Sequence, residues 1–232
     1  MAQLDIEELT VGFRTEDGVV QAVRGVDMSI GDGEVLAVVG ESGSGKSVTA
    51  LSVLGLHPAN RTTMTGRIMW NGENLLTAKQ ERLRQVRGAE IAMIFQDPLS
   101  ALNPVYTVGR QIIEMVRAHE KVGKAEAREK AISMLELVGI PQPSRRVDNY
   151  PHEFSGGMRQ RAMIAMALAC EPRLIIADEP TTALDVTVQA QVLDLLKELA
   201  TQANSALILI THDLGVVARY ADRVAVMYGG RL

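Results

Sequence analysis

Two glycine-rich stretches of the chain have residue types that bind phosphate. The first, GESGSGKS at residues 40–47, fits the pattern G-x-x-x-x-G-K-S, in which small residues let backbone N–H groups converge on phosphate oxygens. Lys46 would reach the β- and γ-phosphates of a nucleotide, and the Ser47 hydroxyl would face Mg²⁺. The residues expected to line this site are Gly40, Glu41, Ser42, Gly43, Ser44, Gly45, Lys46, Ser47 and Val48.

The second stretch is FSGGMRQR at residues 154–161. Ser155, Gly156 and Gly157 come just before a segment with helical spacing, and the N-terminus of a helix favours an anion. The alternative is a glycine turn that starts a helix and holds no ligand. A second phosphate-binding loop, far from the first in the same chain, needs an explanation.

Two acidic residues end a strongly apolar segment, LIIADE at residues 174–179. Asp178 stands where a buried strand ends, and a carboxylate there can help to hold the ligand shell of Mg²⁺. Glu179 is placed to polarise a water molecule. The alternative is an acidic pair that only begins a helix.

Three other side chains are candidates for the same site. Gln96, in MIFQDP, and His212, in LITHD, each follow an apolar strand. Gln96 could touch Mg²⁺ or the attacking water, and His212 could donate to a γ-phosphate; a surface glutamine and an ordinary loop histidine are the alternatives. Phe13 follows the first strand and could stack on an adenine, or it could be an ordinary core aromatic.

The elements that must position these residues alternate between strands and helices. Residues 1–30 alternate apolar and polar side chains, which predicts two half-buried strands joined at TEDG. The apolar runs EVLAVVG and RLIIADEP predict buried strands, and ALILITHD and RVAVMYGG are two further apolar runs of strand length. Residues 97–139 and 156–169 have mostly helical spacing, as does 186–202, where Val188, Val192, Leu195, Leu196 and Leu199 are expected to face inward. This order is typical of an α/β fold with a mostly parallel sheet.

The composition of the chain excludes several classes of protein. Its 232 residues are 47% hydrophobic with a net charge of −4 and 3% aromatics, which argues against a nucleic-acid-binding surface. The single cysteine, Cys170, excludes an internal disulfide and favours a reducing compartment. The first residues do not form a signal peptide, and no apolar run is long enough to span a bilayer.

Taken in order, these motifs make the chain resemble the ATP-binding cassette (ABC) proteins that drive membrane transporters. The resemblance spans nearly all of the chain, from Phe13 through GESGSGKS, Gln96, FSGGMRQR, LIIADE and TALD at 182–185 to His212. In the family's commonest signature, leucine and glutamine stand where this chain has Phe154 and Met158, but the anion-binding Ser-Gly-Gly is intact.

The resemblance implies a fold and a set of subdomains. It implies a P-loop NTPase cassette with a RecA-like parallel-sheet core, an N-terminal antiparallel β subdomain and an inserted α-helical subdomain. The core with its β subdomain would comprise residues 1–96 and 160–232, and the insertion would comprise about 97–159, ending at the signature loop. The abrupt end at Leu232 leads us to expect a C-terminal extension in the natural protein.

The resemblance also explains why one chain has two phosphate loops. In the family, two cassettes pack head to tail, so that Ser155 and Gly157 of one contact the γ-phosphate held by the partner's Lys46. Glu179 would be the catalytic base, His212 would steady the γ-phosphate, and Gln96 would couple the site to the helical insertion. Asp185 would bridge the two cassettes, and ATP and Mg²⁺ would be the cofactors.

The sequences of these motifs resemble those of the branch that serves dipeptide and oligopeptide importers, with nickel and glutathione importers as related alternatives. Such a cassette would lie peripherally on the cytoplasmic face of the membrane, with two transmembrane permease subunits, an extracytoplasmic substrate-binding protein and a second cassette as partners. A non-transport ABC ATPase and a P-loop kinase are the rival readings. A kinase has no need of the FSGGMRQR motif. Chromosome-type ATPases have a long coiled coil between their two nucleotide-binding motifs, and the segment between Lys46 and Asp178 of this chain is too short for one.

Overall fold

The computed structural model describes residues 3–181 and 185–232, and the side chains of residues 186 and 187 are left undescribed. The chain divides into two compact units, one of Met1–Arg87 with Ala206–Leu232 and one of Gly88–Ser205. The first unit is built from two segments distant in sequence, because the chain leaves it after Arg87 and returns to it at Ala206, whereas the second unit is one continuous segment.

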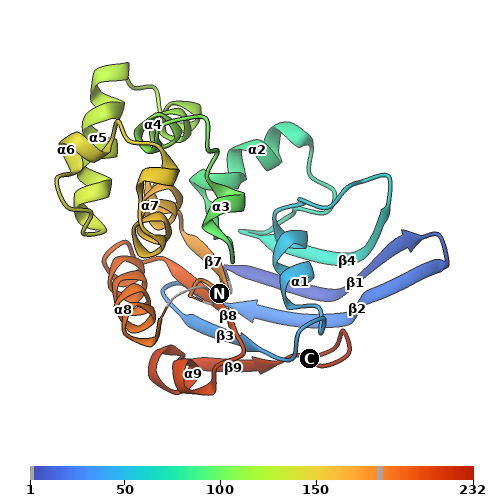
Figure 1. The fold of residues 1–232 in the computed structure, drawn as a ribbon. Coiled ribbons are helices and arrows are strands. Elements are labelled where there is room, and N and C mark those ends of the chain that lie inside the picture. The colour runs from blue at the N-terminus through green and yellow to red at the C-terminus, as the bar shows by residue number, and fades with distance from the viewer. Residues whose placement is uncertain (1–2, 182–184) are drawn as a thin grey trace. The chain divides into compact units, whose positions relative to one another are not determined.

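The first unit contains an antiparallel sheet (Figure 1), with strand order β2-β1-β4-β5. Its strands are β1 (Leu4–Thr15), β2 (Gly18–Ile30), β4 (Thr62–Trp70) and β5 (Glu73–Asn74). The predicted hairpin is present, with Thr15 paired to Gly18 across the turn. The apolar positions of β1 are buried, as expected for a sheet with one face on a core: Leu4, Ile6, Leu9 and Val11 are all 0% exposed.

The same unit contains three parallel strands. β3 (Val35–Val39) pairs on one side with β8 (Ala206–Thr211) and on the other with β9 (Arg223–Val226). Every residue of β3 and β8 is buried, which is why both read as continuous apolar runs. Helix α1 (Lys46–Val53) follows β3, α2 (Gln80–Ala89) follows the antiparallel sheet, and α9 (Leu214–Tyr220) connects β8 to β9.

Helix α1 is held at its C-terminal end by an arginine of α2. The Arg87 guanidinium donates from Nε to the carbonyl oxygen of Leu54 at 2.7 Å and from Nη2 to that of Gly55 at 2.8 Å. These contacts satisfy carbonyl groups that a helix end leaves without internal partners. They fix the far end of the helix that follows the GESGSGKS loop.

The second unit pairs two parallel strands, β6 (Ile91–Ile94) and β7 (Leu174–Asp178). Its helices are α3 (Pro98–Ala101), α4 (Val108–His119), α5 (Lys124–Leu137), α6 (Pro143–Arg146), η1 (Pro151–Glu153), α7 (Gly156–Leu168) and α8 (Val186–Gln202). Residues 97–139 are thus mainly helical, as predicted. None of the described helices is long and apolar enough to cross a membrane.

The buried side of α8 differs in part from the prediction. Val192, Leu196 and Leu199 are buried as expected, whereas Val188 and Leu195 are only half-buried. Leu193 is 3% exposed although it lies off the predicted stripe. The sequence offers several apolar stripes on this helix, and packing against neighbouring elements selects among them.

Candidate nucleotide-binding site

The GESGSGKS loop follows β3 and leads directly into α1, and two of its glycines have no room for a side chain. Gly45 is the N-cap of α1 with φ 109°, a conformation that L-residues rarely adopt. A Cβ at Gly45 would also lie 2.6 Å from the carbonyl oxygen of Ala22. A Cβ at Gly40 would lie 2.1 Å from the carbonyl oxygen of Met227. The backbone of the loop therefore approaches its neighbours more closely than any other residue type allows.

Two polar side chains of the loop are buried within it. Lys46 is 5% exposed, and its Nζ donates to the carbonyl oxygens of Gly40 at 2.8 Å and Glu41 at 2.9 Å. Ser44 is also 5% exposed, and its hydroxyl has no hydrogen-bond partner within the described part of the chain. A buried donor without a partner is costly unless a ligand satisfies it. An ammonium, a hydroxyl and a helix N-terminus in one loop fit the phosphates of a nucleotide.

The rest of the loop is open to solvent. Glu41, Ser42, Gly43 and Ser47 are exposed, and Val48 is half-buried. The predicted Mg²⁺ ligands are the hydroxyl of Ser47, the amide of Gln96 and the carboxylate of Asp178, which offer the oxygen donors that Mg²⁺ prefers. The described residues contain no cluster of three or more His, Cys, Asp or Glu side chains that would hold a metal ion by themselves.

Phe13 lies near the end of β1, opposite Val20 of β2 and Thr62 of β4. Its ring is half-buried and meets the ring of His57 in an edge-to-face contact, with centroids 5.3 Å apart and an interplanar angle of 75°. Sequence reasoning did not select His57, because the only local signal is a histidine after a helix. An edge-to-face partner covers at most one face of Phe13.

His212 follows β8 directly and is exposed. The next residue, Asp213, caps α9 by accepting hydrogen bonds from the backbone N–H of Gly215 at 2.7 Å and of Val216 at 3.3 Å. Thr211, before it, is buried at the end of the strand. The histidine is therefore held between a buried strand end and a helix cap, in the same unit as the GESGSGKS loop.

In the second unit, the structure brings two predicted residues into contact. Asp178 is the buried last residue of β7, and Glu179 follows it with φ 45°, in the left-handed region that is unusual for a non-glycine residue. Gln96, which lies just beyond β6, donates from Nε2 to Oε2 of Glu179 at 3.1 Å. Since β6 and β7 are neighbouring parallel strands, their carboxyl ends meet at one edge of the pair.

The FSGG segment begins α7. Ser155 is the N-cap, and its Oγ accepts from the backbone N–H of Met158 at 3.3 Å. Phe154 is buried, which anchors the start of the loop, whereas Ser155 and Gly156 are exposed. A Cβ at Gly157 would lie 3.2 Å from Cγ1 of Val188, so this glycine lets α7 begin close to α8.

Helix α7 is tied to its surroundings by an arginine that sequence reasoning did not select. Nη1 of Arg161 donates to the carbonyl oxygen of Val138 at 2.8 Å, just after the end of α5. Gly139, next to it, has φ 73°, and a Cβ there would lie 2.7 Å from the same nitrogen. The glycine therefore makes room for the guanidinium.

Asp185 caps the other helix near this segment. Its Oδ1 accepts from the backbone N–H of Val188 at 3.0 Å, and α8 begins at the next residue. The rest of the predicted TALD motif, residues 182–184, lies outside the described residues. The carboxylate has a structural role as a helix cap, and its predicted role in bridging two cassettes stays a prediction.

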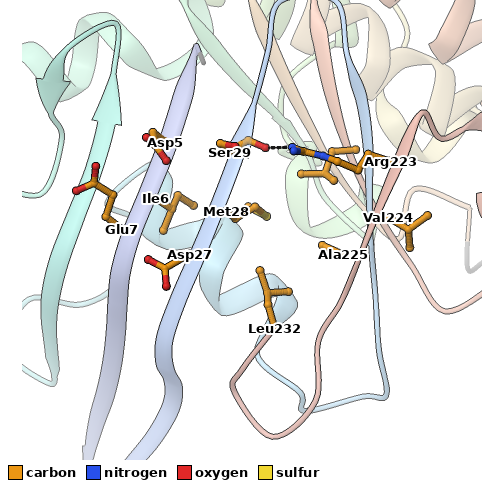
Figure 2. A pocket seen from close by; sticks show the side chains of 11 residues that line it. Asp5, Ile6, Glu7, Asp27, Met28, Ser29, Arg223, Val224, Ala225 and Leu232 are labelled. Carbon is orange, nitrogen blue, oxygen red and sulfur yellow. Dashed lines mark hydrogen bonds between the residues drawn. The ribbon is translucent and has the colours of Figure 1, made fainter. Parts of the chain in front are cut away.

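One pocket of the first unit, of about 380 Å³, contains none of the predicted site residues (Figure 2). Its lining comes from β1, β2, β3, β9 and the last residue, Leu232. Three of the lining side chains are carboxylates, from Asp5, Glu7 and Asp27, and Arg223 donates to the carbonyl oxygen of Ser29. Acidic walls repel phosphate, so this pocket is not a candidate for the nucleotide.

Comparisons with known sequences agree with the motif-based reading. A family model described as "ABC transporter" matches residues 23–182. The probable peptide ABC transporter ATP-binding protein y4tR of Sinorhizobium fredii is 57% identical over 99% of this chain and 69% of its own length. The oligopeptide transport ATP-binding protein OppD of Bacillus subtilis is 54% identical over 99% of this chain and 64% of its own length. The dipeptide transport ATP-binding protein DppD of the same organism is 56% identical over 99% of this chain and 69% of its own length.

Solved structures show the same fold. The ATP-binding cassette MJ0796, in a dimeric post-hydrolysis state bound to ADP and Pi, superposes with a TM-score of 0.86 at 26% identity, over 99% of this chain and 96% of that one. CbiO1 from Clostridium perfringens, part of an ABC transporter complex, superposes with a TM-score of 0.80 at 30% identity, over 99% of this chain and 86% of CbiO1. The predicted fold class and family are confirmed, and the chain belongs to the ABC transporter family, with peptide-transport ATP-binding proteins among its relatives.

Proposed function

We propose that this chain is the ATP-hydrolysing subunit of an importer of dipeptides or oligopeptides. The observation that carries the proposal is the loop between β3 and α1, which combines the buried Lys46 ammonium, a helix N-terminus and a buried Ser44 hydroxyl that has no hydrogen-bond partner among residues 3–181 and 185–232. These groups suit a polyphosphate. The peptide cargo is supported by the names of relatives above 50% identity, not by any residue of the chain.

Each predicted residue has a role in this proposal. Phe13 stacks on the adenine, residues 40–48 hold the phosphates, and Ser47, Gln96 and Asp178 would hold Mg²⁺. The metal would neutralise charge on the β- and γ-phosphates. Glu179 accepts a proton from the attacking water, and the hydrogen bond from Gln96 holds its carboxylate in place. His212 donates to the γ-phosphate.

The signature loop, FSGG at residues 154–157, contacts the nucleotide that a second cassette binds. Ser155, Gly156 and Gly157 contact the γ-phosphate bound by the partner subunit, and Asp185 contacts that subunit across the interface. This role is supported by the exposure of Ser155 and Gly156 at the start of a 13-residue helix. ATP therefore joins the two cassettes, and its hydrolysis lets them separate.

The wider assembly follows from the same proposal. Two transmembrane permease subunits receive the motion through residues 97–159, the helical insertion into a core of residues 1–96 and 160–232. An extracytoplasmic substrate-binding protein delivers the cargo, and the cassette lies peripherally on the cytoplasmic face of the membrane. A family model covering residues 23–182 supports a transporter role and says nothing of the cargo.

An uptake experiment tests this function. Cells carrying the native gene are compared with cells carrying Glu179→Gln, using labelled dipeptides, longer peptides, glutathione and nickel. We expect uptake of dipeptides or longer peptides to collapse. Glu171→Gln is a matched control, because Glu171 also follows a secondary-structure element and also has a positive φ, of 50°. Loss of only nickel or glutathione uptake would contradict the peptide cargo, and no loss at all would contradict the importer.

A further inference from the structure

His57 makes two sets of contacts at once, one to an aromatic ring and one to a helix. Its ring meets Phe13 edge-to-face with centroids 5.3 Å apart. Its Nε2 lies 3.0 Å from the carbonyl oxygen of Val48 and 3.1 Å from Oγ of Ser52. All of these residues belong to the first unit.

The hydrogen bonds determine which nitrogen of the imidazole carries a proton. The Val48 carbonyl can only accept, so Nε2 must be a donor for the contact to be favourable. The Ser52 hydroxyl also donates to this carbonyl, at 2.7 Å, and its oxygen remains able to accept from Nε2. Ser52 is 1% exposed, so the histidine is hydrogen-bonded to a buried residue of α1.

The helix that holds His57 is the one that begins at Lys46. Val48 is two residues beyond Lys46, and Ser52 is one helical turn further. Phe13, by contrast, belongs to β1, whose backbone near this point pairs with β2 and β4. The imidazole is therefore a direct side-chain link between the antiparallel sheet and the helix of the phosphate loop.

We propose that His57 is a positioning residue for the nucleotide base. It fixes the ring of Phe13 relative to α1, so that a base stacked on Phe13 and the phosphates bound at Lys46 share one rigid frame. The inference rests on the proposed function, because it requires Phe13 to be the adenine platform. An edge-to-face contact suits this task, since it restrains the ring and leaves at least one face for stacking.

The proposal predicts a loss of affinity that depends on the base. Binding of Mg-ATP and of inorganic triphosphate with Mg²⁺ is measured by calorimetry on the full chain. For His57→Ala we expect the Kd of ATP to rise by about threefold to tenfold, the scale of an aromatic pair with a hydrogen bond. The Kd of triphosphate should change less than about twofold, because the loop itself is untouched. His152→Ala is the matched control, because His152 also contacts an aromatic ring, that of Tyr150 at 5.6 Å.

Two further variants separate the contacts of the histidine. His57→Phe keeps a ring against Phe13 and loses the hydrogen bonds, whereas His57→Gln keeps a donor and loses the ring. Each should restore part of the ATP affinity, and both keep the test informative if His57→Ala fails to fold. In a Phe13→Ala background, His57→Ala should have almost no further effect on ATP affinity.

The outcomes distinguish this inference from the function on which it rests. An equal loss for ATP and triphosphate would show that His57 only supports α1 and would overturn the inference. The inference would also be overturned if His57→Ala left the Kd of ATP unchanged while Phe13→Ala raised it. If Phe13→Ala leaves ATP binding unchanged, or the unmodified chain binds neither ligand, the proposed nucleotide site itself is wrong.

Discussion

Gln96 and Glu179, 83 residues apart in sequence, are joined by a hydrogen bond of 3.1 Å from Nε2 to Oε2. The donor comes from the segment that follows β6 and the acceptor from the residue that follows β7. An amide N–H that donates to one carboxylate oxygen fixes the direction in which that carboxylate points. A carboxylate held in this way has a fixed position from which to accept a proton from a water molecule. Any movement of the segment that contains Gln96 would also displace the carboxylate of Glu179.

Replacing Glu179 tests its role as the base. Glu179→Gln should reduce ATP hydrolysis by about a hundredfold to ten-thousandfold and leave ATP affinity nearly unchanged, because only proton acceptance is lost. The variant should also accumulate as a dimer with two ATP molecules, measured by sedimentation in the presence of Mg-ATP. Glu171→Gln, at a residue with a similar φ, should hydrolyse ATP normally. A persistent monomer at high protein and ATP concentrations would count against the paired-cassette model and favour a P-loop kinase.

Alanine at Gly45 should be much more damaging than alanine at Gly43. Both residues have positive φ, 109° and 77°, but a Cβ at Gly45 would overlap the Ala22 carbonyl whereas Gly43 faces open space. We expect Gly43→Ala to lower the free energy of unfolding by about 1–2 kcal/mol and Gly45→Ala by more than about 3 kcal/mol. Urea denaturation measures both. Equal losses would mean that backbone conformation alone explains the two glycines.

Gly139 and Arg161 should act as a coupled pair. Arg161→Ala should lower the free energy of unfolding by about 1–3 kcal/mol, because the Val138 carbonyl loses its charged donor. Gly139→Ala should cost a similar amount, since its Cβ would lie 2.7 Å from Nη1 of Arg161. In the double variant the overlap is gone, so the combined loss should fall short of the sum by about 1 kcal/mol. Strict additivity in urea denaturation would show that the two residues act separately.

Cys170 should react slowly with alkylating reagents. Burial, followed by the nearby charge of Glu120, raises the pKa of its thiol to about 11, so it stays protonated at neutral pH. Because the thiolate is the reactive form, the rate with iodoacetamide at pH 8 should be about a hundred times lower than for a free thiol. The rate should rise tenfold per pH unit up to the pKa. In urea the unfolded chain should react at the ordinary rate, and equal rates without urea would contradict the raised pKa.

The buried strands could be predicted because each residue in them faces the core. Val35–Val39 and Ala206–Thr211 are buried throughout, so their apolar runs are unambiguous. Strand β4 was not predicted, because only Ile68 and Trp70 in it are buried and Gly66 interrupts its pattern. Helix α9 has seven residues, too few for a helical period to stand out.

The motifs could be predicted from local spacing, but their contacts could not. GESGSGKS is contiguous, so its residues act within one loop whatever the rest of the chain does. The contacts of Gln96 with Glu179 and of Phe13 with His57 join residues far apart in sequence, and they exist only once the strands have paired. For the same reason, nothing in the sequence pointed to His57 or Arg161.

The contact of Arg87 with the end of α1 has an electrostatic consequence for the phosphate loop. A helix of eight residues is only about 12 Å long, so the negative pole at its C-terminus partly cancels the positive pole at its N-terminus. The Arg87 guanidinium binds the carbonyl oxygens of Leu54 and Gly55 and neutralises that negative pole. The potential at the Lys46 end is therefore more positive than a short helix alone would provide, and a cation outside the loop contributes to the attraction of anions to it.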